Sequence, residues 1–359
     1  MLPNIDTIAM RVRNFNIKAT SSPYKEILKR ELKRLKKRED VLAIGLIGSV
    51  ARGDTWIGSD LDLEIIIKGD RPMEVVLTEQ EVSVDYVYIS EKRTKELYPD
   101  IVPIYDPEGI MRKAIEELDE KKVMNDLKKR VRFSTELATR YLEKALSSMN
   151  SDLNSALCFT HLTGMYSGSS IVLAVTGLSS GRRPVSKLEI VLEKIKRLDL
   201  FDSYLSLYGI PHIISKADLL LNEFREGLQE IWGYFKERKV GPTYVLQQYD
   251  AEPYFRNRIK PIYEYDKRDF VQVAYAMFPY IMLELFKSVG IDDFPSNVFQ
   301  ESKSFIGSAT SWPNRYRRVL ELIPEAHIPL LVSSANRFHK EVQALLTEHE
   351  GLSVLGGQN

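Results

Sequence analysis

A change in the spacing of apolar residues near Pro107 divides this chain of 359 residues into two parts. Beyond Pro107, apolar residues recur at helical intervals over long stretches, a pattern typical of amphipathic helices. Before it, short apolar runs rich in β-branched and aromatic residues alternate with polar turns, which is typical of strands. These runs span residues 41–47, 61–67, 73–78, 82–89 and 101–105. We therefore predict an α+β fold in which a small mixed-sheet domain precedes a mostly helical domain.

The predicted domains are residues 1–110 and residues 111–359. In the second domain, Ser186 and Glu189 have the spacing of a capping box, which predicts that a helix begins at that point. Helices are expected in this domain at residues 111–128, 131–147, 153–175, 188–198, 217–236, 271–289 and 329–346.

The composition argues against several classes of protein. Hydrophobic residues make up 44% of the chain and charged residues 28%, as is usual for a soluble globular protein. Fifty basic residues balance fifty acidic ones, and this zero net charge argues against a protein that coats nucleic acid. The single cysteine, Cys158, excludes an internal disulfide and a cysteine-rich zinc site. With no apolar leader and no apolar run of about 20 residues, the sequence predicts a cytoplasmic protein without a membrane partner.

Residues 24–38 combine helical spacing with many lysines and arginines. A solvated face of an amphipathic helix is the favoured interpretation. A ridge that binds nucleic acid is the alternative, and Glu26, Glu31, Glu39 and Asp40 weaken it because they interrupt the positive charge.

Asp60 and Asp62 are set into the apolar end of the segment GSVARGDTWIGSDLDLEIII, residues 48–67. Alternate residues of a strand project to the same side, about 7 Å apart, so these carboxylates share one face. Two ionised carboxylates repel each other, and burying either without a partner is costly. A divalent cation offsets this cost, and Mg²⁺ favours one or two carboxylates together with substrate phosphates. The pattern therefore predicts a Mg²⁺ site.

A further carboxylate is expected, because a two-metal site for phosphoryl transfer normally has one. Asp85 is favoured, since it interrupts the β-rich run VSVDYVYI, residues 82–89, which would lie beside the strand of the two aspartates. The run at residues 73–78 is expected to pair with it across a polar turn. Glu64 shares the face of the two aspartates by parity and is the alternative, but it lies deeper in the strand.

The other end of the segment has the residues expected of a phosphate site. Gly48 allows the backbone to come close to a phosphate, and amide groups at a strand-to-helix turn bind anions. Ser49 adds a hydroxyl donor, and Arg52 could add a positive charge.

These residues together resemble the signature of the nucleotidyltransferase-fold superfamily. The signature is Gly-Ser, then roughly ten residues, then Asp-x-Asp with apolar neighbours, then an acidic residue on a later strand. Here Gly48 to Gly53 and Ser59 to Leu63 carry it, and the resemblance extends over about residues 25–110. It is strongest to the minimal and kanamycin-nucleotidyltransferase-like members, whose fold is like that of DNA polymerase beta.

The resemblance implies a role for each of these residues. Gly48, Ser49, Arg52 and Ser59 would bind the nucleoside triphosphate, with ATP as the expected donor. Asp60, Asp62 and Asp85 would be catalytic and bind Mg²⁺. The implied reaction is transfer of a nucleoside monophosphate, expected to be AMP, to a hydroxyl of a small molecule or protein, with release of pyrophosphate.

Two other functions remain open. The first is an antitoxin-like or regulatory module that binds a protein through its helical half. The second is an RNA-directed nucleotidyltransferase, which the zero net charge disfavours.

The helical half contains weaker motifs. Cys158 and His161 stand three residues apart on an apolar helix and could bind metal, but a packed cysteine and a hydrogen-bonded histidine are favoured. Residues 241–266 hold five tyrosines and three prolines, and could line an acceptor cleft or form a packed connection. The polar residues of this segment singled out for acceptor binding are Asp250, Glu252, Arg256 and Arg258.

Overall fold

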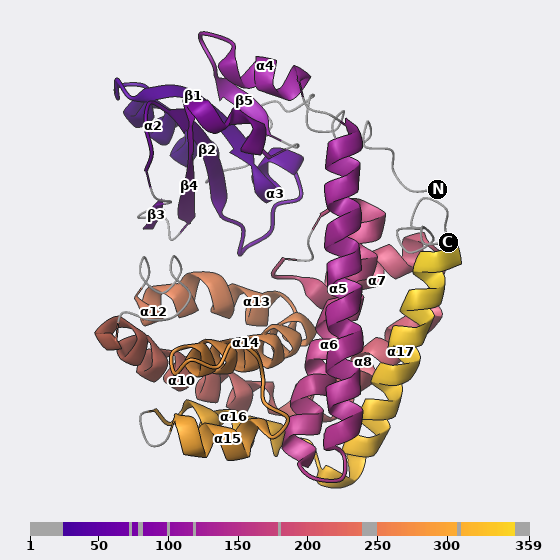
Figure 1. Ribbon diagram of the computed structural model, residues 1–359. Coiled ribbons are helices and arrows are strands. Elements are labelled where there is room, and N and C mark those ends of the chain that lie inside the picture. Colours follow the sequence, from indigo (N-terminus) through magenta and orange to yellow (C-terminus); the bar gives the residue numbers. More distant parts are fainter. Residues whose placement is uncertain are drawn as a thin grey trace. The chain divides into compact units, whose positions relative to one another are not determined.

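The computed structural model describes residues 24–71, 74–77, 82–98, 101–117, 120–178, 181–238, 250–306 and 310–348 (Figure 1). The chain divides into two compact units between Asn125 and Asp126. The first unit contains a mixed β-sheet with helices, and the second is helical in its described residues. This confirms the α+β fold class predicted from the change in apolar spacing.

The sheet has five strands in the order β3-β4-β2-β1-β5. Strand β2 pairs with β4 in parallel, and the other neighbours are antiparallel, including the expected pair of β3 and β4. All five strands fall on the predicted apolar runs: β1 (Val41–Ile47), β2 (Leu61–Ile67), β3 (Glu74–Leu77), β4 (Ser83–Ser90) and β5 (Val102–Tyr105).

Helices cover both faces of the sheet. On one face α2 (Tyr24–Leu35) buries Ile27, Leu28 and Leu35 against the strands, while most of its basic residues are exposed. On the other face Met111 of α4 (Ile110–Glu116) is buried with residues of β1 and β2. The side chain of Met111 lies so close to Gly45 that a Cβ there would be 2.8 Å from its sulfur. Both faces of β1 are therefore buried, as its wholly apolar sequence requires.

The predicted domain boundary at residue 110 precedes α4, which packs on the sheet. The compact unit continues to Asn125, within α5 (Glu120–Ser148). Helix α5 runs without a break from Glu120 to Ser148, so the break expected between residues 128 and 131 is wrong. The first expected helix, residues 111–128, corresponds to α4 and the beginning of α5. The residues at the expected break, Lys129 and Arg130, are good helix formers, and nothing in the sequence ends the helix there.

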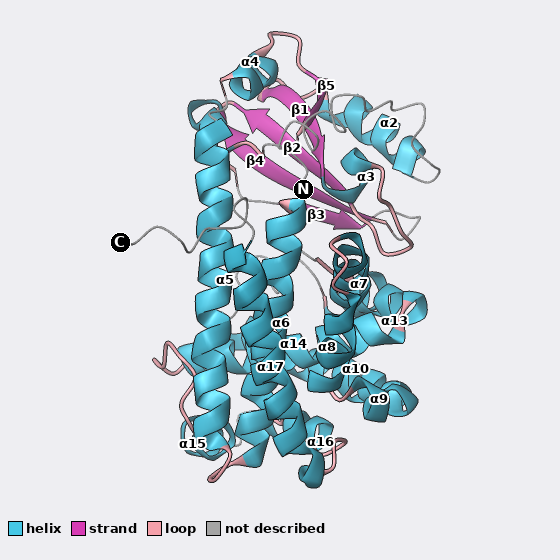
Figure 2. Ribbon diagram, turned by 90° about the vertical axis from the view of Figure 1, so that its right-hand side faces the viewer, coloured by secondary structure: helices cyan, strands magenta, loops and turns pink. Residues whose placement is uncertain are grey.

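The helical unit is built around α6 (Leu153–Thr176), most of whose side chains are buried. Helices α5 and α17 (Ile328–Glu348) run beside it (Figure 2). Gly164 and Gly168 of α6 allow α8 (Phe201–Leu207) to pack closely, because a Cβ on Gly164 would meet Leu207 and a Cβ on Gly168 would meet Tyr204. The remaining helices are α7 (Pro184–Lys194), α9 (Ile210–Ile213), α10 (Ala217–Arg238), α12 (Ala251–Tyr254), α13 (Lys260–Tyr265), α14 (Lys267–Lys287), α15 (Val298–Phe305) and α16 (Trp312–Leu320).

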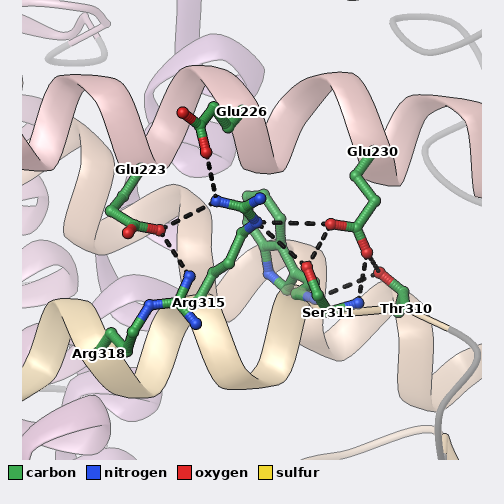
Figure 3. Close-up of polar contacts among 8 residues, drawn as sticks. Glu223, Glu226, Glu230, Thr310, Ser311, Arg315 and Arg318 are labelled. Carbon is green, nitrogen blue, oxygen red and sulfur yellow. Dashed lines mark hydrogen bonds and ion pairs between the residues drawn. The ribbon is translucent and has the colours of Figure 1, made fainter.

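The N-termini of α7 and α16 are capped by carboxylates from other helices. Helix α7 begins at Pro184, so the capping box predicted at Ser186 is wrong, and the backbone amides of Val185 and Ser186 donate to Asp269 of α14 instead. At α16, Glu230 of α10 accepts hydrogen bonds from the amide and hydroxyl of Ser311 and from the hydroxyl of Thr310 (Figure 3).

Among the described helices, α14 alone has the length and apolar composition of a membrane span. Within α14, 67% of the apolar stretch is buried inside the helical unit, which is typical of a core helix.

Candidate metal and nucleotide site

The site begins where β1 ends and the short helix α3 (Gly48–Arg52) starts. Gly48 has a φ of +76°, in the left-handed region that side chains disfavour. A Cβ on Gly48 would lie 2.1 Å from a carboxylate oxygen of Asp62. Glycine is therefore required here for two reasons, the backbone conformation and the close approach of Asp62.

Three carboxylates converge beside this turn. Asp60 directly precedes β2, Asp62 lies within it, and Asp85 is the residue of β4 that pairs with Asp62 in parallel register. One oxygen from each carboxylate lies within 4.8 Å of the others. Asp60 and Asp85 are buried and Asp62 is half-buried. The convergence expected if β4 lies beside β2 is confirmed.

A hydrogen bond between two serines links the Gly48 turn to the segment that precedes Asp60. The Ser49 hydroxyl donates to Ser59 Oγ over 2.9 Å, and the backbone amide of Trp56 donates to the same oxygen over 3.0 Å. The structure thus places Ser49 and Ser59 together although ten residues separate them. Their roles as nucleotide ligands stay predictions.

Residues 25–133 match the family model of the nucleotidyltransferase domain. This part of the chain is a nucleotidyltransferase domain. The comparison with curated proteins found no significant match to this chain. The match covers the five-stranded sheet, the turn at Gly48 and the three converging carboxylates.

The donor set of the nucleotidyltransferase domain fits a magnesium ion. All three groups are carboxylates, and hard oxygen ligands are those that Mg²⁺ prefers. Three acidic groups this close repel one another, so a divalent cation between them would remove an electrostatic cost. The partial exposure of Asp62 leaves one side of the group open to solvent.

Glu64 does not belong to this group. Its side chain is fully buried, and its Oε2 accepts a hydrogen bond from the backbone amide of Tyr98 over 3.2 Å. In the described residues of the nucleotidyltransferase domain, the acidic side chains that could share a metal are the three aspartates. The geometry therefore favours Asp85 over Glu64 as the third carboxylate.

Arg52 lies at the end of α3, where its guanidinium is 3.6 Å from the carboxylate of Asp54. The Arg52 side chain is 19% exposed. Its positive charge is thus partly offset by Asp54, and its predicted contact with a phosphate stays a prediction.

Tyr24 is a residue of the site region that the sequence did not indicate. Its hydroxyl lies 3.1 Å from the carbonyl oxygens of both Trp56 and Ser59. No local pattern could have revealed this contact, because 32 and 35 residues separate the partners.

In the helical unit Cys158 and His161 are core residues. Both are fully buried, and the imidazole of His161 packs against the rings of Tyr208 and Tyr275. Burial raises the pKa of Cys158 to about 12 and lowers that of His161 to about 3. A packing role for both is confirmed. The expected hydrogen bond of His161 is not seen, since neither ring nitrogen has a partner in the described residues.

Part of the tyrosine-rich segment, residues 241–249, lies outside the described residues. Within the described part, Asp250 pairs with Lys236, and Glu252 pairs with Arg225, both in α10. Arg256 is exposed and Arg258 is buried, both in a wide helical turn, Phe255–Ile259. This turn precedes Pro261, which has no backbone amide to continue the α-helical hydrogen bonds.

Proposed function

We propose that this protein transfers a nucleoside monophosphate, with ATP as the expected donor, to a hydroxyl of a small molecule or protein. Pyrophosphate is the second product. The observation that carries the proposal is the convergence of Asp60, Asp62 and Asp85 beside the Gly48 turn of a nucleotidyltransferase domain.

In the proposed reaction the three aspartates would hold Mg²⁺, which when bound would supply positive charge to the phosphates. The Gly48 turn admits the phosphates close to the backbone, and Ser49 supplies a hydroxyl donor to them. The acceptor hydroxyl gives up its proton to solvent, and its oxygen forms a bond to the α-phosphorus while the bond to pyrophosphate breaks. In this mechanism, the protein accelerates the reaction by positioning the reacting groups and by neutralising the charge of the phosphates.

Charge supports an acceptor other than nucleic acid. The chain has no net charge, and three of the five cations of α2 are paired with acids: Lys29 with Glu26, and Arg30 and Arg34 with Glu31. Nucleic-acid binding depends on unpaired cations that replace the counterions of the phosphates. We therefore favour a compact polar acceptor or a protein side chain over RNA.

The test is incubation of the protein in cell extract with Mg²⁺ and each nucleoside triphosphate, labelled at the α-phosphate in one series and at the γ-phosphate in another. Label should pass to an acceptor from the α-labelled nucleotide alone. The Asp62→Asn protein is the matched control and should transfer nothing. Transfer from the γ-label, or equal labelling by the control, would refute the proposal.

A nuclease arm identifies the class of acceptor. We expect the labelled product to form in nuclease-treated extract and to resist nuclease afterwards. Loss of the product in that arm would identify the protein as an RNA-directed enzyme.

A further inference from the structure

We propose that Tyr24 and Ser59 are positioning residues, whose hydrogen bonds hold the loop before Asp60 so that the three carboxylates stay together. The effect of these residues on catalysis depends on the proposed function. Its physical content, a fixed loop beside a carboxylate cluster, can be tested without the acceptor.

Ser59 is bonded through its backbone and its side chain. Its amide donates to the carbonyl of Trp56 over 2.9 Å, and its Oγ accepts from the amide of Trp56 and from the hydroxyl of Ser49. These bonds close residues 56–59 into a tight turn and tie it to the start of α3. Because Ser59 is 6% exposed, water competes little for these bonds.

Tyr24 connects this turn to the core of the domain. Its ring is buried with the apolar residues between α2 and the sheet, and its hydroxyl lies 3.1 Å from the carbonyl oxygens of Trp56 and Ser59. A buried ring has few rotamers available, so the hydroxyl position is set by the packing of the core. The turn is thus held from one side by Ser49 and from the other by Tyr24.

The turn needs this support because of the residue that follows it. Asp60 belongs to a group of carboxylates within 4.8 Å of one another, and their mutual repulsion favours movement of Asp60 away from the strands. Asp62 and Asp85 are fixed by strand pairing, whereas Asp60 lies just outside β2. The bonds of Tyr24 and Ser59 therefore oppose the repulsion at the one carboxylate that the sheet does not hold.

The assignment gives Ser59 a role that does not depend on direct binding of nucleotide. Its oxygen accepts two hydrogen bonds, from Trp56 and Ser49, and so connects the turn to α3. We infer that Ser59 acts through Asp60 and Ser49, which it orients, and that its loss lowers metal affinity even when no nucleotide is present.

The experiment compares Tyr24→Phe with Tyr88→Phe in the full chain. Tyr88 is the matched control, because its hydroxyl also bonds within the same domain, to Arg38, away from the loop. The probe is Mn²⁺ alone, whose affinity is measured by electron paramagnetic resonance. We expect Tyr24→Phe to weaken Mn²⁺ binding by about three- to tenfold, the range for one hydrogen bond, and Tyr88→Phe to leave it unchanged.

The fluorescence of Trp56 provides a second readout, which is taken in the absence of metal. The other tryptophans, Trp232 and Trp312, are 3% and 0% exposed, whereas Trp56 is partly exposed in the turn itself. In metal-free protein, Tyr24→Phe and Ser59→Ala should shift the emission to longer wavelength and lower its anisotropy. Ser59→Thr, which keeps the hydroxyl, should restore most of the Mn²⁺ affinity.

Unchanged Mn²⁺ affinity and emission in Tyr24→Phe would overturn the inference, as would equal losses in Tyr88→Phe. Failure of wild type to bind Mn²⁺ would overturn it as well. Mn²⁺ binding that depends on Tyr24, in a protein that transfers no nucleotide, would support the positioning role and refute the proposed function instead.

Discussion

Two features of the structure require glycine at position 48: the left-handed backbone conformation and the close approach of a carboxylate. The φ of +76° disfavours any side chain, and the nearest atom to an added Cβ would be an oxygen of Asp62. Gly69 shares the first constraint, with a φ of +86°, but an added Cβ there would meet nothing within 4 Å. The two glycines therefore separate the cost of conformation from the cost of displacing the Asp62 carboxylate.

We expect Gly48→Ala and Gly69→Ala each to destabilise the protein by about 1 kcal/mol for the left-handed conformation. Only Gly48→Ala should also lower Mn²⁺ affinity and abolish nucleotide transfer, because it moves Asp62. Thermal unfolding and Mn²⁺ titration measure the two effects separately. Equal metal affinity in both variants would show that Asp62 does not depend on Gly48.

The repulsion among the aspartates predicts opposite effects on activity and stability. Asp60→Asn and Asp62→Asn should abolish transfer, while thermal stability without metal should hold or rise because a negative charge is removed. The measurement is the melting temperature in the presence of a chelator, alongside the transfer assay. Near wild-type transfer by both variants would refute the metal site.

Asp85 and Glu64 provide a matched pair on neighbouring strands of the sheet. Asp85→Asn should lower turnover at least about 100-fold, the scale of losing one charge-stabilising group, and Glu64→Gln far less. Glutamine retains an oxygen that can accept from the Tyr98 amide, so the hydrogen bond of Glu64 is preserved. The reverse order of the two losses would mean that Glu64 is the third carboxylate.

At the scale of elements, the sequence indicated the strands well and the helix ends poorly. Each strand carries its own signal, an apolar run with β-branched residues, and the parity of Asp60 and Asp62 placed both on one face. Helix ends depend on caps, and two of the caps come from distant helices. Asp269 lies 84 residues from Val185, and Glu230 lies 81 residues from Ser311, so no local pattern could reveal either. For the same reason Tyr24 could not be assigned to the site.

The cap at α16 can be tested within one cluster of residues (Figure 3). Glu230 accepts hydrogen bonds from Ser311, Thr310 and Arg315, whereas Glu226 contacts Arg315 alone in this cluster and is 63% exposed. Glu230→Ala should lower the free energy of unfolding by about 1–3 kcal/mol, and Glu226→Ala by less than about 0.5 kcal/mol. Urea unfolding measures both, and equal losses would contradict a capping role for Glu230.

At the scale of the whole molecule, two buried histidines make stability depend on pH. Burial lowers the pKa of His161 to about 3 and that of His339 to about 4. In the unfolded chain a histidine has a pKa of about 6.5. Unfolding therefore takes up protons at pH values between the folded and the unfolded pKa. The stability associated with the neutral imidazoles is fully present above about pH 6.5 and is lost as the pH falls.

We expect the free energy of unfolding to decrease by up to about 1.4 kcal/mol per pH unit for each histidine as pH falls from about 6 to 4. His161→Phe should reduce this slope and remain about as stable as wild type near neutral pH, because the ring still packs between Tyr208 and Tyr275. Urea unfolding at several pH values, followed by helical circular dichroism, measures the slope. An unchanged slope in the variant would contradict the assignment.

The parallel pairing of β2 with β4 also bears on the order in which the chain folds. The hairpin of β3 and β4 joins near neighbours, whereas Asp62 and Asp85 are 23 residues apart and meet only when that hairpin docks on β2. Contacts between near neighbours form earlier because closing a short loop costs less entropy. We therefore expect the aspartates to meet late in folding, after apolar residues have begun to collapse. Their repulsion would then slow the final docking step, and added salt, by screening it, would speed that step.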